Sequence, residues 1–275
     1  MILFLIKKTF FDFWDNLITI ILLNIGFLII GLGEIYFFWS FFKFGVTYLV
    51  NASVLLVLFL YYLFFIIGSI VFFIYVGAVA KILKKIADYK RPDFQDFYIY
   101  LKETYKASSI FAVIFSSYFY IYFISGRFYL NLNIQVGGLN IGAIIFIILF
   151  FISFFILLAS QYFFPLQSNF DLIIKKNIKK MFLILFDNTG FSFFLLSLNI
   201  IIFILSFFTF FVFFGFAVNL LLMTVAFKLR LYKYDYLEEH PDYNKRNIPW
   251  DELLSYDRDM VGKRTLKGMI FPWKE

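Results

Sequence analysis

The sequence predicts an all-α, polytopic integral membrane protein with about six transmembrane helices and further amphipathic helices on the cytoplasmic side. Three observations predict this class. Apolar residues make up 63% of the chain, against roughly 45–50% in an average soluble domain. Charged residues make up only 16%, and residues 191–227 contain none. The remaining charges gather in a few segments between long apolar runs, as expected for a chain that crosses a bilayer several times.

The N-terminal part predicts an interfacial helix followed by the first span. Residues 2–13 are apolar and aromatic around two lysines, which is typical of a helix that lies at the membrane surface. The first expected span covers residues 17–33 and is closed by Glu34. Residues 35–50 are aromatic and contain one charge, Lys43, so they predict an interfacial or re-entrant segment on the far side.

The second expected span, residues 53–82, is longer than a bilayer requires, and its Gly68 and Gly77 would let a neighbouring helix approach closely. A basic segment follows. Asp93 is then a good N-cap for a cytoplasmic amphipathic helix. The third expected span covers residues 108–125.

The fourth expected span covers residues 141–166, and a lysine-bearing amphipathic helix follows it. As one helix, the charge-free residues 191–227 would be ~55 Å long, which is far more than one bilayer. We therefore expect two spans there, residues 191–208 and 212–227, although the break between them is poorly defined by the sequence.

The distribution of basic residues predicts the orientation. With the N-terminus in the cytoplasm, 23 of the 25 lysines and arginines lie inside, and only Lys43 and Arg127 lie outside. This arrangement places both termini in the cytoplasm. It divides the chain into a transmembrane domain, residues 1–228, and a cytoplasmic tail, residues 229–275. The tail is nearly neutral and too short for a core of its own, so it either packs on the cytoplasmic loops or becomes ordered on a partner.

Composition and motifs exclude several classes of function. The chain has no cysteine and a single histidine, His240, which excludes thiolate chemistry and histidine-based metal clusters. No catalytic or nucleotide-binding motif is present, so we expect neither an enzyme nor a cofactor. The net charge of +7 follows from the orientation and does not call for a nucleic-acid partner.

Polar residues inside spans are the candidate site residues. Asn24, Asn199 and Asn219 are expected within the first, fifth and sixth spans, and Gln161 and Pro165 near the end of the fourth. Amide contacts between helices are a more common role for such residues than a ligand pocket, and a helix exit is a more common role for the proline than a hinge. With Glu34 at a boundary, no ionisable residue is expected deep in a span, which argues against a proton- or sodium-coupled transporter.

The lysine-bearing helix predicts contact with the membrane surface. Its four lysines share one side, and each would contribute about 1 kcal/mol of attraction to anionic lipid headgroups. The alternative is a helix that docks on a soluble protein partner. The four residues are Lys175, Lys176, Lys179 and Lys180.

Three stretches resemble the YesL-like family of bacterial integral membrane proteins, which are of unknown function. They are FWDNLITIILLNIGFLI, AKILKKIADYKRPDFQDFYIYLKETYKAS and QYFFPLQSNFDLIIKKNIKKMFLILFDN. The chain departs from the family pattern between Gly31 and Ser53 and after about Asp235. The resemblance implies a multi-pass protein of the bacterial cytoplasmic membrane. It also implies an accessory role linked with carbohydrate-uptake systems.

Two functions are therefore open at the level of sequence. The first is a non-catalytic accessory or partner-binding component of a membrane complex. The alternative is a transporter or permease for a small solute or lipid.

Overall fold

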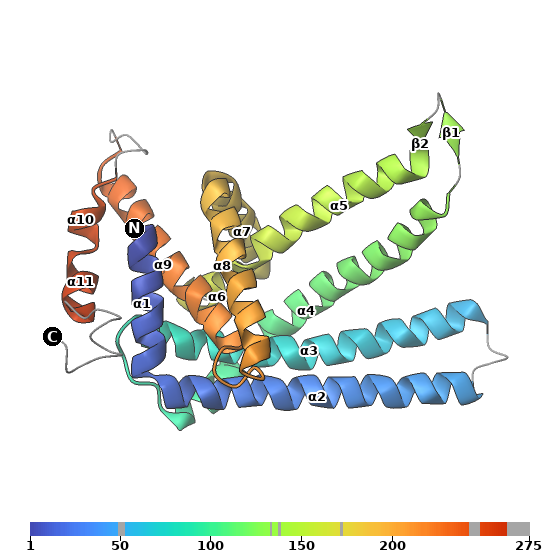
Figure 1. The fold of residues 1–275 in the computed structure, drawn as a ribbon, viewed down its shortest axis with the longest axis horizontal. Helices are drawn as coiled ribbons and strands as arrows, with labels where there is room; N and C mark the ends of the chain where they lie inside the picture. The colour runs from blue at the N-terminus through green and yellow to red at the C-terminus, as the bar shows by residue number, and fades with distance from the viewer. Residues whose placement is uncertain (49–52, 133, 137–138, 171–172, 242–247, 263–275) are drawn as a thin grey trace.

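The computed structural model describes the whole chain except residues 49–52, 133, 137–138, 171–172, 242–247 and 263–275 (Figure 1). The described residues are almost entirely helical. One two-stranded antiparallel hairpin pairs Gln135 with Asn140 and Val136 with Leu139. The elements are α1 Ile2–Asp15, α2 Leu17–Tyr48, α3 Val54–Ala87, α4 Phe94–Leu130, β1 Gln135–Val136, β2 Leu139–Asn140, α5 Ile141–Ser160, α6 Phe163–Phe170, α7 Ile174–Asp187, α8 Thr189–Phe208, α9 Phe216–Glu239, α10 Trp250–Leu253 and α11 Ser255–Val261.

The structure confirms an all-α protein with the character of a membrane protein. Among the described residues, five helical stretches are long and apolar enough to cross a bilayer: Leu17–Lys43, Val54–Ala87, Gln95–Leu130, Ile141–Phe170 and Thr189–Phe208. The sixth expected span, residues 212–227, falls on α9, which begins at Phe216 and is not among the five. The reason is that α9 continues past its apolar half into a charged half that carries Lys228, Arg230 and Lys233.

Several element boundaries differ from those expected. The third span and the amphipathic helix before it form one helix, α4. Its N-cap is Asp93, as expected, and Asp93 forms a capping box with Asp96. The helix expected over residues 141–166 ends at Ser160, and α6 starts separately at Phe163. Residue 229, where the tail was expected to begin, lies within α9, which continues to Glu239.

The largest difference concerns α2. Residues 35–50 were expected to be interfacial or re-entrant, whereas the helix that begins at Leu17 continues without a break to Tyr48. The aromatic side chains there do not end the helix, because Phe37 and Phe41 pack on Phe64 of α3, at ring distances of 4.8 and 3.6 Å. Glu34 therefore lies near the middle of a helix and not at its boundary.

Two long helical hairpins give the molecule its shape. α2 and α3 run side by side, and α4 and α5 form a second hairpin that diverges from the first, while α1, α8 and α9 run across them (Figure 1). Gly77 of α3 permits its contact with α4, since a Cβ there would meet the Ser108 hydroxyl and Thr104. The far halves of the hairpins expose apolar side chains that lipid would cover, including Ile29, Ile35, Leu55 and Phe123.

The best-buried core lies where α1, α3, α6 and α9 meet. Its largest fully buried apolar side chains include Leu5, Ile20, Leu83, Ile86, Tyr162, Phe163 and Phe227. The C-terminal helices α10 and α11 also reach this region, since Leu254 and Val261 belong to the same core. Of the two roles expected for the tail, its described part therefore adopts packing against the rest of the chain.

Candidate functional site

Two of the sequence-predicted site residues, Gln161 and Asn219, line the same cavity. The cavity has a volume of about 260 Å³, and its walls are mostly apolar, with seven phenylalanines. Each amide nitrogen already donates to a backbone carbonyl, from Gln161 Nε2 to Ser192 O at 3.2 Å and from Asn219 Nδ2 to Gly215 O at 3.3 Å. Both amide oxygens are buried without a hydrogen-bond partner among the described residues. The remaining lining residues are Phe27, Phe72, Phe73, Val76, Phe111, Phe115, Leu157, Ser160, Phe164, Leu196, Phe216, Leu220 and Met223.

The two unpaired amide oxygens are themselves almost completely shielded, so the accessible surface of the cavity is apolar. An unpaired buried carbonyl oxygen costs about 1–3 kcal/mol, which the packing of the surrounding side chains has to offset. Ser160 lines the wall as well, but its hydroxyl donates to Leu157 O at 2.7 Å. The cavity is therefore suited to a small apolar molecule.

Pro165 and Asn199 do not line this cavity. Pro165 lies in the first turn of α6, where a missing backbone N–H costs little, and its carbonyl accepts from Ser168 Oγ and Asn169 Nδ2 at 3.0 and 2.8 Å. Asn199 Nδ2 donates to Leu195 O within α8 at 3.0 Å. Neither contact points to a ligand.

Asn24 has a structural position that its sequence context did not reveal. From α2 it donates to Val212 O and Phe213 O at 3.1 and 3.0 Å, and its Oδ1 accepts from the Ala217 N–H at 3.0 Å. It therefore binds the turn between α8 and α9 and satisfies one of the free N–H groups at the start of α9. A Cβ on Gly215 would be 2.5 Å from Asn24 Oδ1, so glycine is required beside this contact.

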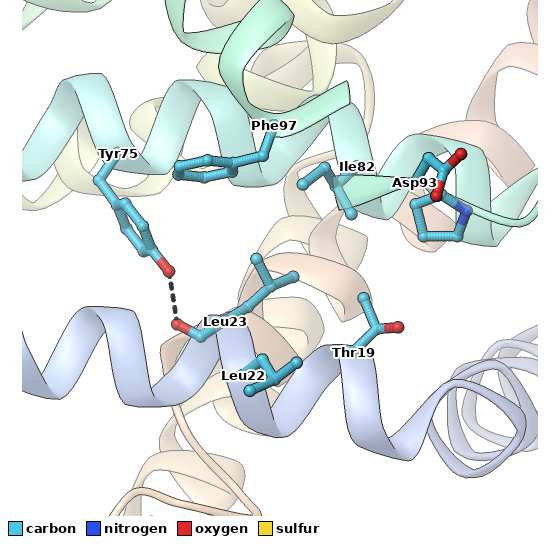
Figure 2. Close-up of a pocket in the computed structure, with 8 residues that line it drawn as sticks. Thr19, Leu22, Leu23, Tyr75, Ile82, Asp93 and Phe97 are labelled. Atoms are coloured by element: carbon cyan, nitrogen blue, oxygen red, sulfur yellow. Dashed lines mark hydrogen bonds between the residues drawn. The ribbon is translucent and has the colours of Figure 1, made fainter. Parts of the chain in front are cut away.

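A second cavity, of about 220 Å³, lies between α2, α3 and the start of α4 (Figure 2). Tyr75 closes one side of it by donating from its hydroxyl to Leu23 O at 2.8 Å, and Phe97 packs against the Tyr75 ring. Asp93 lies at the other side, next to Ile82. Apart from Thr19, the rest of the lining is apolar. The hydrogen bond drawn in Figure 2 joins two wall residues, and the lining contains no cluster of reactive groups.

The four lysines of α7 are exposed, as a surface role requires. The opposite face of α7, however, is packed on the protein: Asn177, Met181, Ile184 and Leu185 are buried, and Asn177 Nδ2 donates to Gln167 Oε1 at 2.9 Å. The helix is thus held in place by the packing of this face, whereas Leu183 and Phe186 remain exposed. Lys175, Lys176, Lys179 and Lys180 form no ion pair with another described residue, although Lys180 lies over the Phe170 ring. We call these four residues the α7 basic surface.

Sequence reasoning missed a buried ionic cluster that joins the two ends of the chain. Lys8 of α1 pairs with Asp12 at 3.0 Å and lies 3.9 Å from Asp257 of α11. Lys228 of α9 pairs with the same Asp257 carboxylate at 3.4 Å and with Asp88 at 3.2 Å. Lys8 and Asp257 are fully buried. The signal was weak, because these residues are separated by up to 249 positions and each looks like an ordinary surface charge.

Tyr89 covers the cluster from the end of α3. Its ring lies 3.7 Å from Lys8 Nζ, and its hydroxyl donates to the Asp257 carbonyl at 3.3 Å. Burial, with the nearby Asp257 charge, raises the pKa of the Tyr89 hydroxyl. Tyr89 has a φ of 59°, a left-handed conformation that is uncommon outside glycine, which indicates that this packing fixes the backbone at the end of α3.

The pKa of Asp12 gives the cluster a predicted pH dependence. Burial raises the pKa of the Asp12 carboxyl to about 6, although Lys8 opposes the shift, and burial lowers the pKa of Lys8. The folded protein therefore binds this proton more tightly than the unfolded chain does. Stability should rise as the pH falls from about 6 to about 4, and the contribution is lost above the folded pKa. A shift of about two units corresponds to at most ~3 kcal/mol.

Thermal unfolding in detergent between pH 4.5 and 7 tests this expectation. The Asp12→Asn variant, which cannot titrate at this position, should show a smaller rise in stability on acidification than the wild type. Equal pH dependence of the two proteins would contradict it.

A second polar junction joins α7, α8 and α9. Asp187 accepts from Lys233 Nζ at 2.8 Å and from the Tyr234 hydroxyl at 2.9 Å. Asn188 accepts from the same Lys233 at 3.2 Å. Arg230 lies over the Phe191 ring, at 3.8 Å from its centroid. The polar residues before α8 thus bind the charged half of α9.

These features together define a helical integral membrane protein. Its long membrane-crossing hairpins extend from a packed region that contains α1, α9 and the buried ionic cluster. Within the described residues no group of three or more His, Asp or Glu side chains is arranged to hold a metal ion. Beyond this class, no protein-family model, curated protein or solved structure matches the chain.

Proposed function

We propose that the protein is a non-catalytic accessory component of a complex in the bacterial cytoplasmic membrane, and that it binds an acidic partner protein through the α7 basic surface. The observation that carries this proposal is the combination of four exposed lysines with a packed opposite face. Because α7 is already ordered, binding there would not require the helix to fold first, which avoids part of the entropic cost of association.

The orientation of the chain supports the same proposal. With its termini in the cytoplasm, the α7 basic surface faces the cytoplasm, where both acidic proteins and anionic lipid headgroups are available. Charge attraction of this kind weakens as salt is added. A partner held by the α7 basic surface should therefore dissociate at high ionic strength.

The proposal is tested by purification of tagged protein from native membranes in mild detergent. Replacing Lys175, Lys176, Lys179 and Lys180 together by glutamine should abolish recovery of a stoichiometric partner. The matched control removes four positive charges elsewhere on the surface, by glutamine at Lys90, Arg91, Lys102 and Lys106, and should retain the partner. Equal recovery from both variants would contradict the proposal, and a change only in co-purified anionic lipid would assign the surface to the bilayer.

The alternative function is a transporter or permease for a small solute or lipid. One observation favours it: the aromatic cavity between the helices, with its two unpaired amide oxygens, has room for a small molecule. Flux of a solute into proteoliposomes that contain the purified protein alone would support transport over the accessory role.

A further inference from the structure

The most unusual polar group in the hairpin of α2 and α3 is the carboxyl of Glu34. Its side chain packs against Gly68 of α3, where an added Cβ would lie 3.6 Å from Glu34 Cδ. In α3, residues 54–80 contain no charge, and Gly68 is close to the middle of that run. A helical run of this length extends ~40 Å.

This position places Glu34 inside the bilayer wherever the bilayer lies along α3. The hydrocarbon core is about 30 Å thick, so any core placed within a 40 Å run contains the middle of that run. The middle is also at least ~10 Å from either edge of the core. The same result holds if α3 is tilted, because tilting shortens its extent across the membrane.

Among the described residues, nothing beside Glu34 balances a negative charge. A space of about 320 Å³ beside it is lined by Ile30, Gly33, Phe37, Ile67, Gly68 and Val71. Glu34 Oε1 is buried and has no hydrogen-bond partner among the described residues. An isolated carboxylate in such a place is very costly, and ionisable groups inside a membrane usually serve a function.

We propose that Glu34 is an exchangeable proton-binding site within the bilayer. A proton is the ligand that a single carboxyl can bind by itself, whereas metal cations such as calcium or magnesium require six or more ligands, mostly oxygens, which these walls do not provide. This inference does not depend on the α7 basic surface. It reverses the expectation that no ionisable group lies deep in a span, which rested on a first helix that ends at residue 33.

Carbodiimides of different polarity test the site. A protonated carboxyl gives its proton to one carbodiimide nitrogen while its oxygen bonds to the central carbon, and the O-acylisourea then rearranges to a stable N-acylurea, with no group leaving. Dicyclohexylcarbodiimide enters the hydrocarbon core, whereas a cationic, water-soluble carbodiimide does not. Mass spectrometry of peptides from protein in lipid nanodiscs identifies the modified residue.

Glu103 is the matched control, because its side chain is 47% exposed and pairs with Lys81 at 2.9 Å. Dicyclohexylcarbodiimide should modify Glu34 on the order of tenfold more than Glu103, and the water-soluble reagent should show the reverse preference. The adduct should be absent from Glu34→Gln. Preferential modification of Glu34 by the water-soluble reagent would place it at the membrane surface and overturn the inference.

Infrared spectroscopy supplies an independent readout of the bound proton. The wild type at neutral pH should show the carbonyl band of a protonated carboxyl that Glu34→Gln lacks, and this band should shift when the nanodiscs are transferred to D₂O. A missing band would show an ionised carboxylate, and a band that does not shift would show a proton that does not exchange. Either result would overturn the inference.

Discussion

Replacing Asp257 with alanine is expected to lower the free energy of unfolding by about 3–5 kcal/mol, the cost of removing one partner from a buried ion pair. Asp257 is fully buried, and its carboxylate lies 3.4 Å from Lys228 Nζ and 3.9 Å from Lys8 Nζ. Without it, the buried ammonium group of Lys8 and the partly buried one of Lys228 would share the remaining carboxylates Asp12 and Asp88. The two ammonium groups would then repel each other without the attraction of the Asp257 carboxylate to offset the repulsion.

The control for this substitution lies on the preceding helix. Asp251 of α10 pairs with Arg258 at 2.7 Å, but its side chain is 89% exposed. Asp251→Ala should therefore cost no more than about 1 kcal/mol. Thermal unfolding of both variants in the same detergent compares a buried and an exposed ion pair within one segment. A loss for Asp257→Ala no larger than that for Asp251→Ala would show that the cluster does not hold the two ends together.

Release of the C-terminal helices can be followed separately. The chain has no cysteine, so a single cysteine introduced at Val261, which is 1% exposed, reports on α11 without background. A maleimide should label it slowly in otherwise wild-type protein and much faster when Asp257 is alanine. A truncated protein used to study the tail should keep residues 1–262, because removing Asp257 would destabilise the fold itself.

The sequence predicted the class of the protein because the signal for membrane helices is local. Long apolar runs, such as those of α3 and α5, can be recognised as membrane helices without knowing which helices they pack against. Some cap positions were also readable, since Asp93 acts at the start of α4 as expected.

What the sequence could not show depends on contacts between distant residues. The aromatic part of α2 looked unlike a membrane helix because its packing partner, Phe64, lies on another helix. Because the first span was expected to end at residue 33, Glu34 was placed at its boundary, whereas it lies near the middle of α2. The cluster around Asp257 was invisible for a similar reason, since burial and not residue type distinguishes its lysines from those of the α7 basic surface. Gln161 and Asn219 were selected as single polar residues, but only the fold shows that they share a cavity.

Replacing Asn24 with leucine is expected to cost about 2–4 kcal/mol and to loosen the turn between α8 and α9. The substitution removes two donors to Val212 O and Phe213 O and one acceptor for the Ala217 N–H, all in a site where Asn24 is 1% exposed. Groups left unpaired in such surroundings lose more than the net value of an ordinary hydrogen bond. Asn199→Leu is the matched control, because Asn199 is also buried but its hydrogen bond to Leu195 O stays within its own helix.

Hydrogen exchange distinguishes a local effect of Asn24 from general destabilisation. The Ala217 amide should lose protection in Asn24→Leu and keep it in Asn199→Leu, since only Asn24 accepts from that group. Asn24→Asp refines the test: a carboxylate can still accept from Ala217 but cannot donate to the two carbonyls. Protection at Ala217 should then survive while overall stability falls. If Asn24→Leu and Asn199→Leu behaved alike, Asn24 would be an ordinary buried amide, and the α8–α9 turn would be held by the packing of its phenylalanines alone.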